Sequence, residues 1–161
     1  MGQLGRAADR KVTGPEVEAP LDALAREFEH YDRGERSEML IDYADRFTDV
    51  PPEVATRPFA ESHRAPRCES EAFVWAVDRP DGTVKLYFAV ENPQGLSAKA
   101  WAVILDETLS SRPLTEIAGL SGEAIFKIFG RDLSMGKGQG LLGMFELAQH
   151  EAKKRLAGRM V

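Results

Sequence analysis

The sequence is poor in the residues that form disulfides and bind metals. Its 161 residues include one cysteine, Cys68, and three histidines, His30, His63 and His150. A single cysteine cannot form an intramolecular disulfide, which is typical of a protein from a reducing compartment. The four residues include no pair at the spacing of zinc or iron–sulfur ligands. We therefore expect no bound metal, no cofactor and a cytoplasmic protein.

Long apolar runs and an excess of positive charge are also absent. No apolar run approaches the ~20 residues of a membrane-spanning helix, and the first residues, MGQLGRAADRK, lack the apolar core of a secretory signal. The 21 Lys and Arg residues are outnumbered by 26 Asp and Glu residues, so the formal net charge is −5. Because nucleic-acid binding depends largely on phosphate neutralisation, this balance argues against it. We expect neither a membrane nor a nucleic-acid partner.

The familiar hydrolase and nucleotide-binding patterns are absent or incomplete. The sequence has no G-x-S-x-G, and His63, five residues from Cys68 in a loop, is not a convincing base for a cysteine hydrolase. The stretch SMGKGQGLLGM contains G-x-G-x-x-G, but no strand precedes it as a dinucleotide site requires. Lys137 is followed by Gly138 rather than Ser or Thr, so the phosphate-loop pattern fails too. We interpret these glycines as a flexible turn that starts the final helix.

The residues that are present predict an α+β domain. Residues 71–77 and 83–90 are rich in β-branched and aromatic side chains, and DRPDG between them supplies the turn residues Pro80, Asp81 and Gly82. This pattern predicts an antiparallel hairpin within a small sheet of two or three strands. One face of the hairpin carries large apolar side chains and must be covered.

Helices are predicted to provide this cover. Apolar residues at three- and four-residue spacing place them at residues 20–32, 36–47, 96–109, 113–119, 122–130 and 140–158. We expect the RGE sequence at residues 33–35 to break the chain between the first two, and prolines to keep the stretch before Cys68 irregular. Residues 1–19 are polar and aperiodic, so we predict a flexible tail followed by a single domain at residues 20–158.

Cys68 lies between a charged loop and the first strand, in the segment HRAPRCESEAFVW. A lone cysteine is most often a small buried residue without chemistry. Here, however, Arg64 and Arg67, with His63 when protonated, would favour the thiolate, which is the nucleophilic form. Two nearby glutamates partly oppose this effect. An incidental cysteine therefore remains an alternative to a reactive one that accepts and donates a single group, such as a persulfide sulfur.

Four segments in order resemble the SufE family of sulfur-acceptor proteins. They are LIDYADRFTDVPPEVATRP, RCESEAFVWAV, NPQGLSAKAWAVIL and LSMGKGQGLLGMFELAQ, and the similarity is collinear from about residue 20 to residue 157. The resemblance implies a compact α+β fold with a small curved sheet packed by helices, like that of the IscU scaffold proteins. It also implies that the cysteine lies on a loop and that its sulfur can enter an apolar hollow.

The resemblance further implies a specific role for Cys68, which matches the acceptor position. Proteins of this family bind a pyridoxal-phosphate-dependent cysteine desulfurase (SufS-like), take its persulfide sulfur, stimulate its turnover and pass the sulfur to an iron–sulfur scaffold. Such a protein is a carrier and partner rather than a stand-alone enzyme, and we expect a monomer. We interpret His63, Arg64 and Arg67 as electrostatic tuning residues, and we expect Lys137 and Gln139 to contribute to docking.

Two departures from the family pattern stand out. Arg67 occupies the position before the cysteine where relatives usually have glycine, which should stiffen the loop and add positive charge. Lys137 stands near the glycine-rich stretch where relatives often carry arginine, so a bidentate contact becomes a point-charge contact.

The alternative function is a binding regulator of a desulfurase whose cysteine is incidental.

Overall fold

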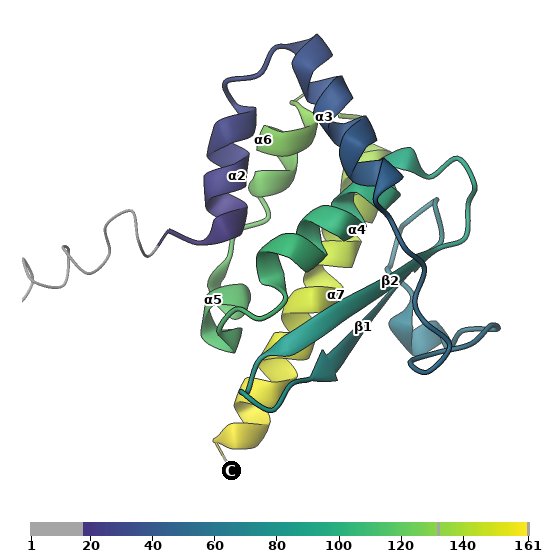
Figure 1. Ribbon diagram of the computed structural model, residues 1–161, viewed down its shortest axis with the longest axis vertical. Coiled ribbons are helices and arrows are strands. Elements are labelled where there is room, and N and C mark those ends of the chain that lie inside the picture. Colours follow the sequence, from purple (N-terminus) through teal and green to yellow (C-terminus); the bar gives the residue numbers. More distant parts are fainter. Residues whose placement is uncertain (1–17, 132, 161) are drawn as a thin grey trace, which may run out of the picture.

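A long C-terminal helix and a two-stranded hairpin form the frame of the molecule (Figure 1). The computed structural model describes residues 18–131 and 133–160. The tail expected at residues 1–19 therefore lies almost entirely outside the described residues. The helices are α2 (Pro20–Phe28), α3 (Arg33–Asp45), α4 (Leu96–Leu109), α5 (Leu114–Gly119), α6 (Ala124–Phe129) and α7 (Met135–Arg159); the strands are β1 (Ala72–Asp78) and β2 (Val84–Val90), and η2 (Glu61–His63) is a 3-10 turn. The predicted α+β class is confirmed.

The hairpin forms because its turn residues bond locally. Gly82 has a φ of +87°, which glycine adopts without steric cost. The Asp81 carboxylate accepts hydrogen bonds from the amide and the hydroxyl of Thr83, at 3.0 and 2.6 Å. The resulting register pairs Ala72 with Val90 and continues along both strands. Within the described residues the sheet has two strands, the lower of the two expected numbers.

Both faces of the hairpin carry large apolar side chains, whereas the sequence pattern predicted one. Val74 and Phe88 lie on the face that packs on the helices. Phe73 and Trp75 lie on the opposite face, because successive side chains of a strand alternate. This second face is covered by the proline-containing segment through Val50, Val54, Ala55 and Phe59. The segment before Cys68 is thus a packing element and not only a connection.

Two helices begin earlier than their sequence patterns suggested. The α3 helix includes the expected break at residues 33–35, because Asp32 and Glu35 form a reciprocal capping box: each side chain accepts a hydrogen bond from the other's amide, at 2.8 and 2.9 Å. The α7 helix begins at Met135, capped by the Ser134 hydroxyl, which accepts from the Lys137 amide at 3.3 Å. The glycine-rich stretch is therefore the first turns of a helix, not a flexible turn.

The α7 helix is attached to the hairpin near its C-terminal end by Arg155. Its guanidinium donates to the Asp78 carboxylate at 2.6 Å, to the Ala76 carbonyl at 3.2 Å and to the Glu151 carboxylate at 2.8 Å. Partial burial opposes ionisation of Glu151, but hydrogen bonds from Arg155 and Lys154 outweigh it, and the pKa of Glu151 is lowered. These contacts hold the C-terminal part of α7 beside the end of β1.

A buried hydrogen bond joins α4 to α7. The fully buried Trp101 donates from its indole nitrogen to the Leu141 carbonyl at 2.9 Å. Its ring also meets Phe129 and Phe145 at centroid distances of 5.8 and 6.4 Å. These contacts set the position of α4 against the glycine-bearing turns of α7.

Candidate functional site

The loop that carries Cys68 is anchored at both ends to the hairpin. On one side the Ala65 amide donates to the Ala72 carbonyl at 2.8 Å. On the other side the Asn92 amide donates to the Ser70 carbonyl at 3.1 Å, which extends the ladder of β1 and β2. Cys68 lies between these two anchors, so its backbone is confined to a short span.

Two residues of this loop adopt left-handed backbone conformations. Arg67 has a φ of +60° and Glu71 a φ of +53°, and the Glu71 amide closes the turn on the Cys68 carbonyl at 3.1 Å. A non-glycine residue in this region costs roughly 1 kcal/mol. Residue 67 is the position where the SufE resemblance leads one to expect glycine, and its backbone is one that glycine adopts without that cost. The loop of this chain is therefore strained where it meets the cysteine.

The loop lies directly on a glycine surface of α7. A β-carbon placed on Gly140 would be 3.0 Å from the Cys68 α-carbon, and one placed on Gly143 would be 2.4 Å from the Pro66 carbonyl oxygen. No real side chain tolerates the shorter distance without movement. These glycines are thus required by the close approach of the loop. Sequence reasoning missed this role; the signal was the three-residue spacing of Gly140 and Gly143, which places them on one helix face.

Cys68 is half-buried and borders a hollow of about 330 Å³. The hollow is lined by the beginnings of two helices, Gly95–Ala98 at α4 and Gly136–Lys137 at α7. The α4 helix has no side-chain cap, so amide groups at its start are left for other acceptors. Helix N-termini favour negative charge, so this surrounding suits an anionic sulfur group.

The lining of the hollow is mixed rather than apolar. It combines Leu96 and Leu141 with polar residues from three segments. The polar ones are Glu69, Ser70, Asn92, Gln94, Ser97 and Lys137. A sulfur that enters the hollow would therefore meet hydrogen-bonding groups as well as apolar surface.

The three residues interpreted as tuning groups have partners other than the thiol. Arg64 pairs with Glu71 at 3.4 Å, and Arg67 pairs with Glu146 at 3.3 Å. His63 contacts the Val74 carbonyl through Nδ1 at 2.9 Å, and its ring stacks on Trp75 with centroids 5.3 Å apart. Within the described part of the chain, none of the three has a hydrogen bond or ion pair with Cys68.

Of the two expected docking residues, one lies at the cysteine hollow. Lys137 lines it together with Cys68. Gln139 instead lines a second, apolar hollow with Phe126 and Met135, and Met135 is 79% exposed. The structure therefore brings Lys137 to the cysteine and places Gln139 at another surface.

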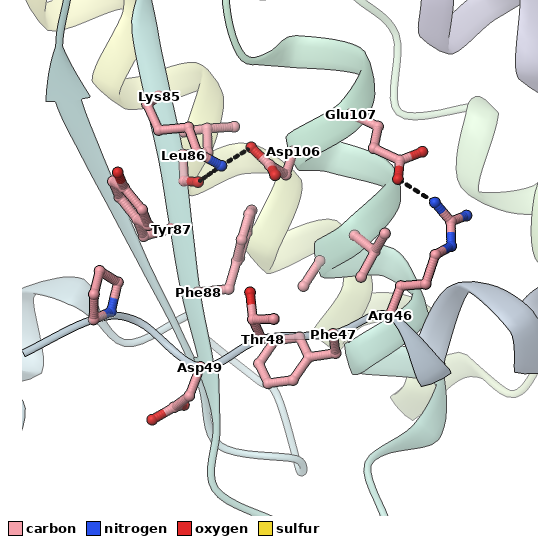
Figure 2. A pocket seen from close by; sticks show the side chains of 13 residues that line it. Arg46, Phe47, Thr48, Asp49, Lys85, Leu86, Tyr87, Phe88, Asp106 and Glu107 are labelled. Carbon is pink, nitrogen blue, oxygen red and sulfur yellow. Dashed lines mark hydrogen bonds and ion pairs between the residues drawn. The ribbon is translucent and has the colours of Figure 1, made fainter.

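A roomier hollow of about 440 Å³ lies between α4, β2 and residues 46–51 (Figure 2). Its charged groups already have partners: Lys85 pairs with Asp106 at 2.6 Å and Arg46 with Glu107 across the hollow, and Asp49 pairs with Arg57 at 2.8 Å. It contains neither the cysteine nor a histidine. Among the described residues, no group of three His, Cys, Asp or Glu side chains could hold a metal ion. We therefore take the hollow beside Cys68 as the candidate functional site.

The fold and the site together define a class of protein: an α+β domain that presents a single thiol on an anchored turn beside two helix N-termini. Comparison with known families agrees with this class. The profile of SufE, described as the Fe-S metabolism associated domain, matches residues 22–152. The chain belongs to the SufE family and is thereby associated with iron–sulfur metabolism.

A solved structure has the same fold. It is the solution structure of a hypothetical protein from Thermus thermophilus, which is 25% identical to this chain and superimposes with a TM-score of 0.65. The match covers 86% of this chain and 98% of that chain. Among curated proteins no relative was found. In the described residues, no helix is both long and apolar enough to cross a membrane.

Proposed function

We propose that this protein accepts a sulfur atom on Cys68 from the persulfide of a cysteine desulfurase. The Cys68 thiolate attacks the outer sulfur of the desulfurase persulfide, and a new S–S bond forms at Cys68. The bond between the outer sulfur and the desulfurase cysteine breaks, and that cysteine leaves as a thiolate with the electron pair. The exchange needs no external oxidant or reductant, because one S–S bond replaces another.

The observation that carries this proposal is the placement of the thiol. Cys68 lies on a turn anchored at both sides, half-buried, with a hollow beside it that has room for one additional sulfur. The helix starts at Gly95–Ala98 and Gly136–Lys137 would stabilise the negative charge of the persulfide. A persulfide held there is shielded on one side and can reach a second protein when the loop moves.

This chemistry and the family support a proposal for the partners. The donor is a pyridoxal-phosphate-dependent cysteine desulfurase of the SufS kind, which the protein also stimulates, and the recipient is an iron–sulfur scaffold. Lys137, which lines the hollow together with Cys68, would meet an acidic group of a partner there. We expect the protein to act as a monomer in the cytoplasm.

The test is the intact mass of the protein after incubation with a SufS-like desulfurase and cysteine. We expect the mass of one added sulfur on the wild type, its loss after reduction by dithiothreitol, and no adduct on Cys68→Ser. An equal adduct on Cys68→Ser, or none on the wild type, would refute the proposal. Stimulation of the desulfurase is measured in parallel: full stimulation by Cys68→Ala would show that the protein is a binding regulator with an incidental cysteine.

A further inference from the structure

Between its two anchors, the cysteine loop is held by very few polar contacts. In the described part of the chain, the backbone groups of Pro66, Arg67 and Glu69 form no hydrogen bond with any other element. The Cys68 carbonyl bonds only within the loop, to the Glu71 amide. The backbone of this stretch packs on α7 at Gly140 and Gly143, which have no side chain to interlock with it, and the Cys68 side chain packs against the apolar core. The stretch can therefore separate from α7 without breaking any backbone ladder.

Among the described residues, one ion pair connects this stretch to α7. The Arg67 guanidinium lies 3.3 Å from the Glu146 carboxylate, which α7 presents one turn beyond Gly143. Both side chains are about half exposed, at 50% and 51%. An ion pair in this environment is weak and sensitive to salt, as a reversible contact must be.

The backbone of the loop opposes this contact. Arg67 and Glu71, which flank the turn, are both in the left-handed region that disfavours side chains. Separation from α7 would let Arg67 return to an ordinary conformation, whereas Glu71 stays bonded to the hairpin through its carbonyl, which accepts from the Glu91 amide at 3.1 Å. The closed loop is thus a balance between backbone strain and the pair of Arg67 with Glu146.

We propose that Arg67 and Glu146 form a latch that holds the Cys68 loop closed on α7, and that breaking this pair exposes the thiol. The two are positioning residues: they act on the cysteine through the loop and do not touch the reacting sulfur. This inference rests on the proposed function for its biological meaning, but not for its test. A desulfurase that competes for either charge would open the loop as it docks.

The test measures how fast Cys68 reacts with a bulky maleimide, with iodoacetamide as a small comparator. Removal of the pair in Glu146→Gln should raise the maleimide rate roughly two- to fivefold, the range expected for an exposed ion pair. The charge-swapped protein with Arg67→Glu and Glu146→Arg should return towards the wild-type rate. High salt should accelerate the wild type and the swapped protein but not the single variant.

Two controls separate access from electrostatics. Glu69→Gln removes a carboxylate next to Cys68 that forms no ion pair with any described residue, so it changes local charge without touching the latch. A pH profile of the rate distinguishes the effects further: loss of the latch raises the plateau at high pH, whereas a change in ionisation shifts only the midpoint. Circular dichroism shows whether each variant is folded. If Glu146→Gln does not fold, Arg67→Gln replaces it as the variant that lacks the ion pair.

The proposal is overturned if Glu146→Gln reacts with the wild-type plateau rate, if Glu69→Gln produces an equal increase, or if the swapped protein stays as fast as the single variant. Because the assay contains no desulfurase, its outcome is independent of whether Cys68 accepts sulfur. A functional latch on a protein that forms no persulfide would refute the proposed function alone.

Discussion

Replacement of Gly143 by alanine is the sharpest test of how the cysteine loop is seated. The new β-carbon would lie 2.4 Å from the Pro66 carbonyl oxygen, whereas ordinary contact begins at 3.4 Å. The loop must therefore withdraw from α7 by about 1 Å, since the obstructing atom belongs to the backbone and cannot rotate away. Cys68, two residues further along the chain, must move with it.

The change in the free energy of unfolding of Gly143→Ala is the sum of two opposing effects. Overpacking of this kind costs about 1–3 kcal/mol, and alanine recovers about 1 kcal/mol over glycine inside a helix. The free energy of unfolding of Gly143→Ala should thus be unchanged or lower by up to about 2 kcal/mol. Gly138→Ala is the matched control in the same helix, because its nearest neighbour would be the flexible Leu133 side chain at an ordinary 3.5 Å. That variant should gain about 0.5–1 kcal/mol.

Urea unfolding measures the free energy of unfolding of each variant, and the alkylation rate of Cys68 measures how accessible the loop makes the thiol. We expect Gly143→Ala to be less stable than Gly138→Ala by about 1–3 kcal/mol and to react faster at Cys68. Gly158→Ala, with no atom within 4 Å of its new β-carbon, should resemble Gly138→Ala in leaving the rate unchanged. If Gly143→Ala were as stable as Gly138→Ala and its thiol equally reactive, the loop would not be seated on this glycine.

Three further outcomes are expected. Arg67→Gly should be more stable than Arg67→Ala by about 1 kcal/mol in urea unfolding, the reverse of the usual order, because only glycine avoids the left-handed penalty. The pKa of Glu151 is lowered from its ordinary value of 4.5. The carboxylate therefore stabilises the fold above pH 4.5, and this stabilisation is lost as the pH falls through the pKa of the folded state. The melting temperature of Glu151→Gln should consequently depend less on pH below about 4.5 than that of the wild type. Trp101→Phe removes the hydrogen bond to Leu141 and should lower the free energy of unfolding by about 1–3 kcal/mol, and an unchanged melting temperature would contradict this.

Three features of the site would serve the proposed transfer of sulfur: the glycine surface of α7, the latch and the helix N-termini beside Cys68. The glycines at positions 140 and 143 allow the loop to approach α7, and Arg67 with Glu146 would hold it there. The hollow beside Cys68 would then receive the acquired sulfur. An acceptor must protect its sulfur and later release it, and a weakly held loop on a rigid frame suits both requirements.

Much of the frame is determined by the sequence alone. The hairpin follows from β-branched strands around Asp81 and Gly82, and the amphipathic helices follow from apolar spacing, because both depend on residues close together in the chain. The α+β class and the membership of the SufE family agree with what the sequence motifs indicated. The capping box of Asp32 and Glu35 is also local, and it starts α3 at the residues where the sequence pattern predicted a break.

Tertiary structure decided how the site is built, because its contacts join residues far apart in sequence. The left-handed backbone of Arg67 and its pair with Glu146 depend on where α7 lies relative to β1. The stacking of His63 on Trp75 follows from the path of the irregular segment across the outer face of the hairpin. The glycine-rich stretch that was predicted to be a flexible turn forms the start of α7, and Gly140 and Gly143 let the loop of Cys68 approach this helix closely. Local pattern selected the cysteine; the packing of loop on helix determines how it is held.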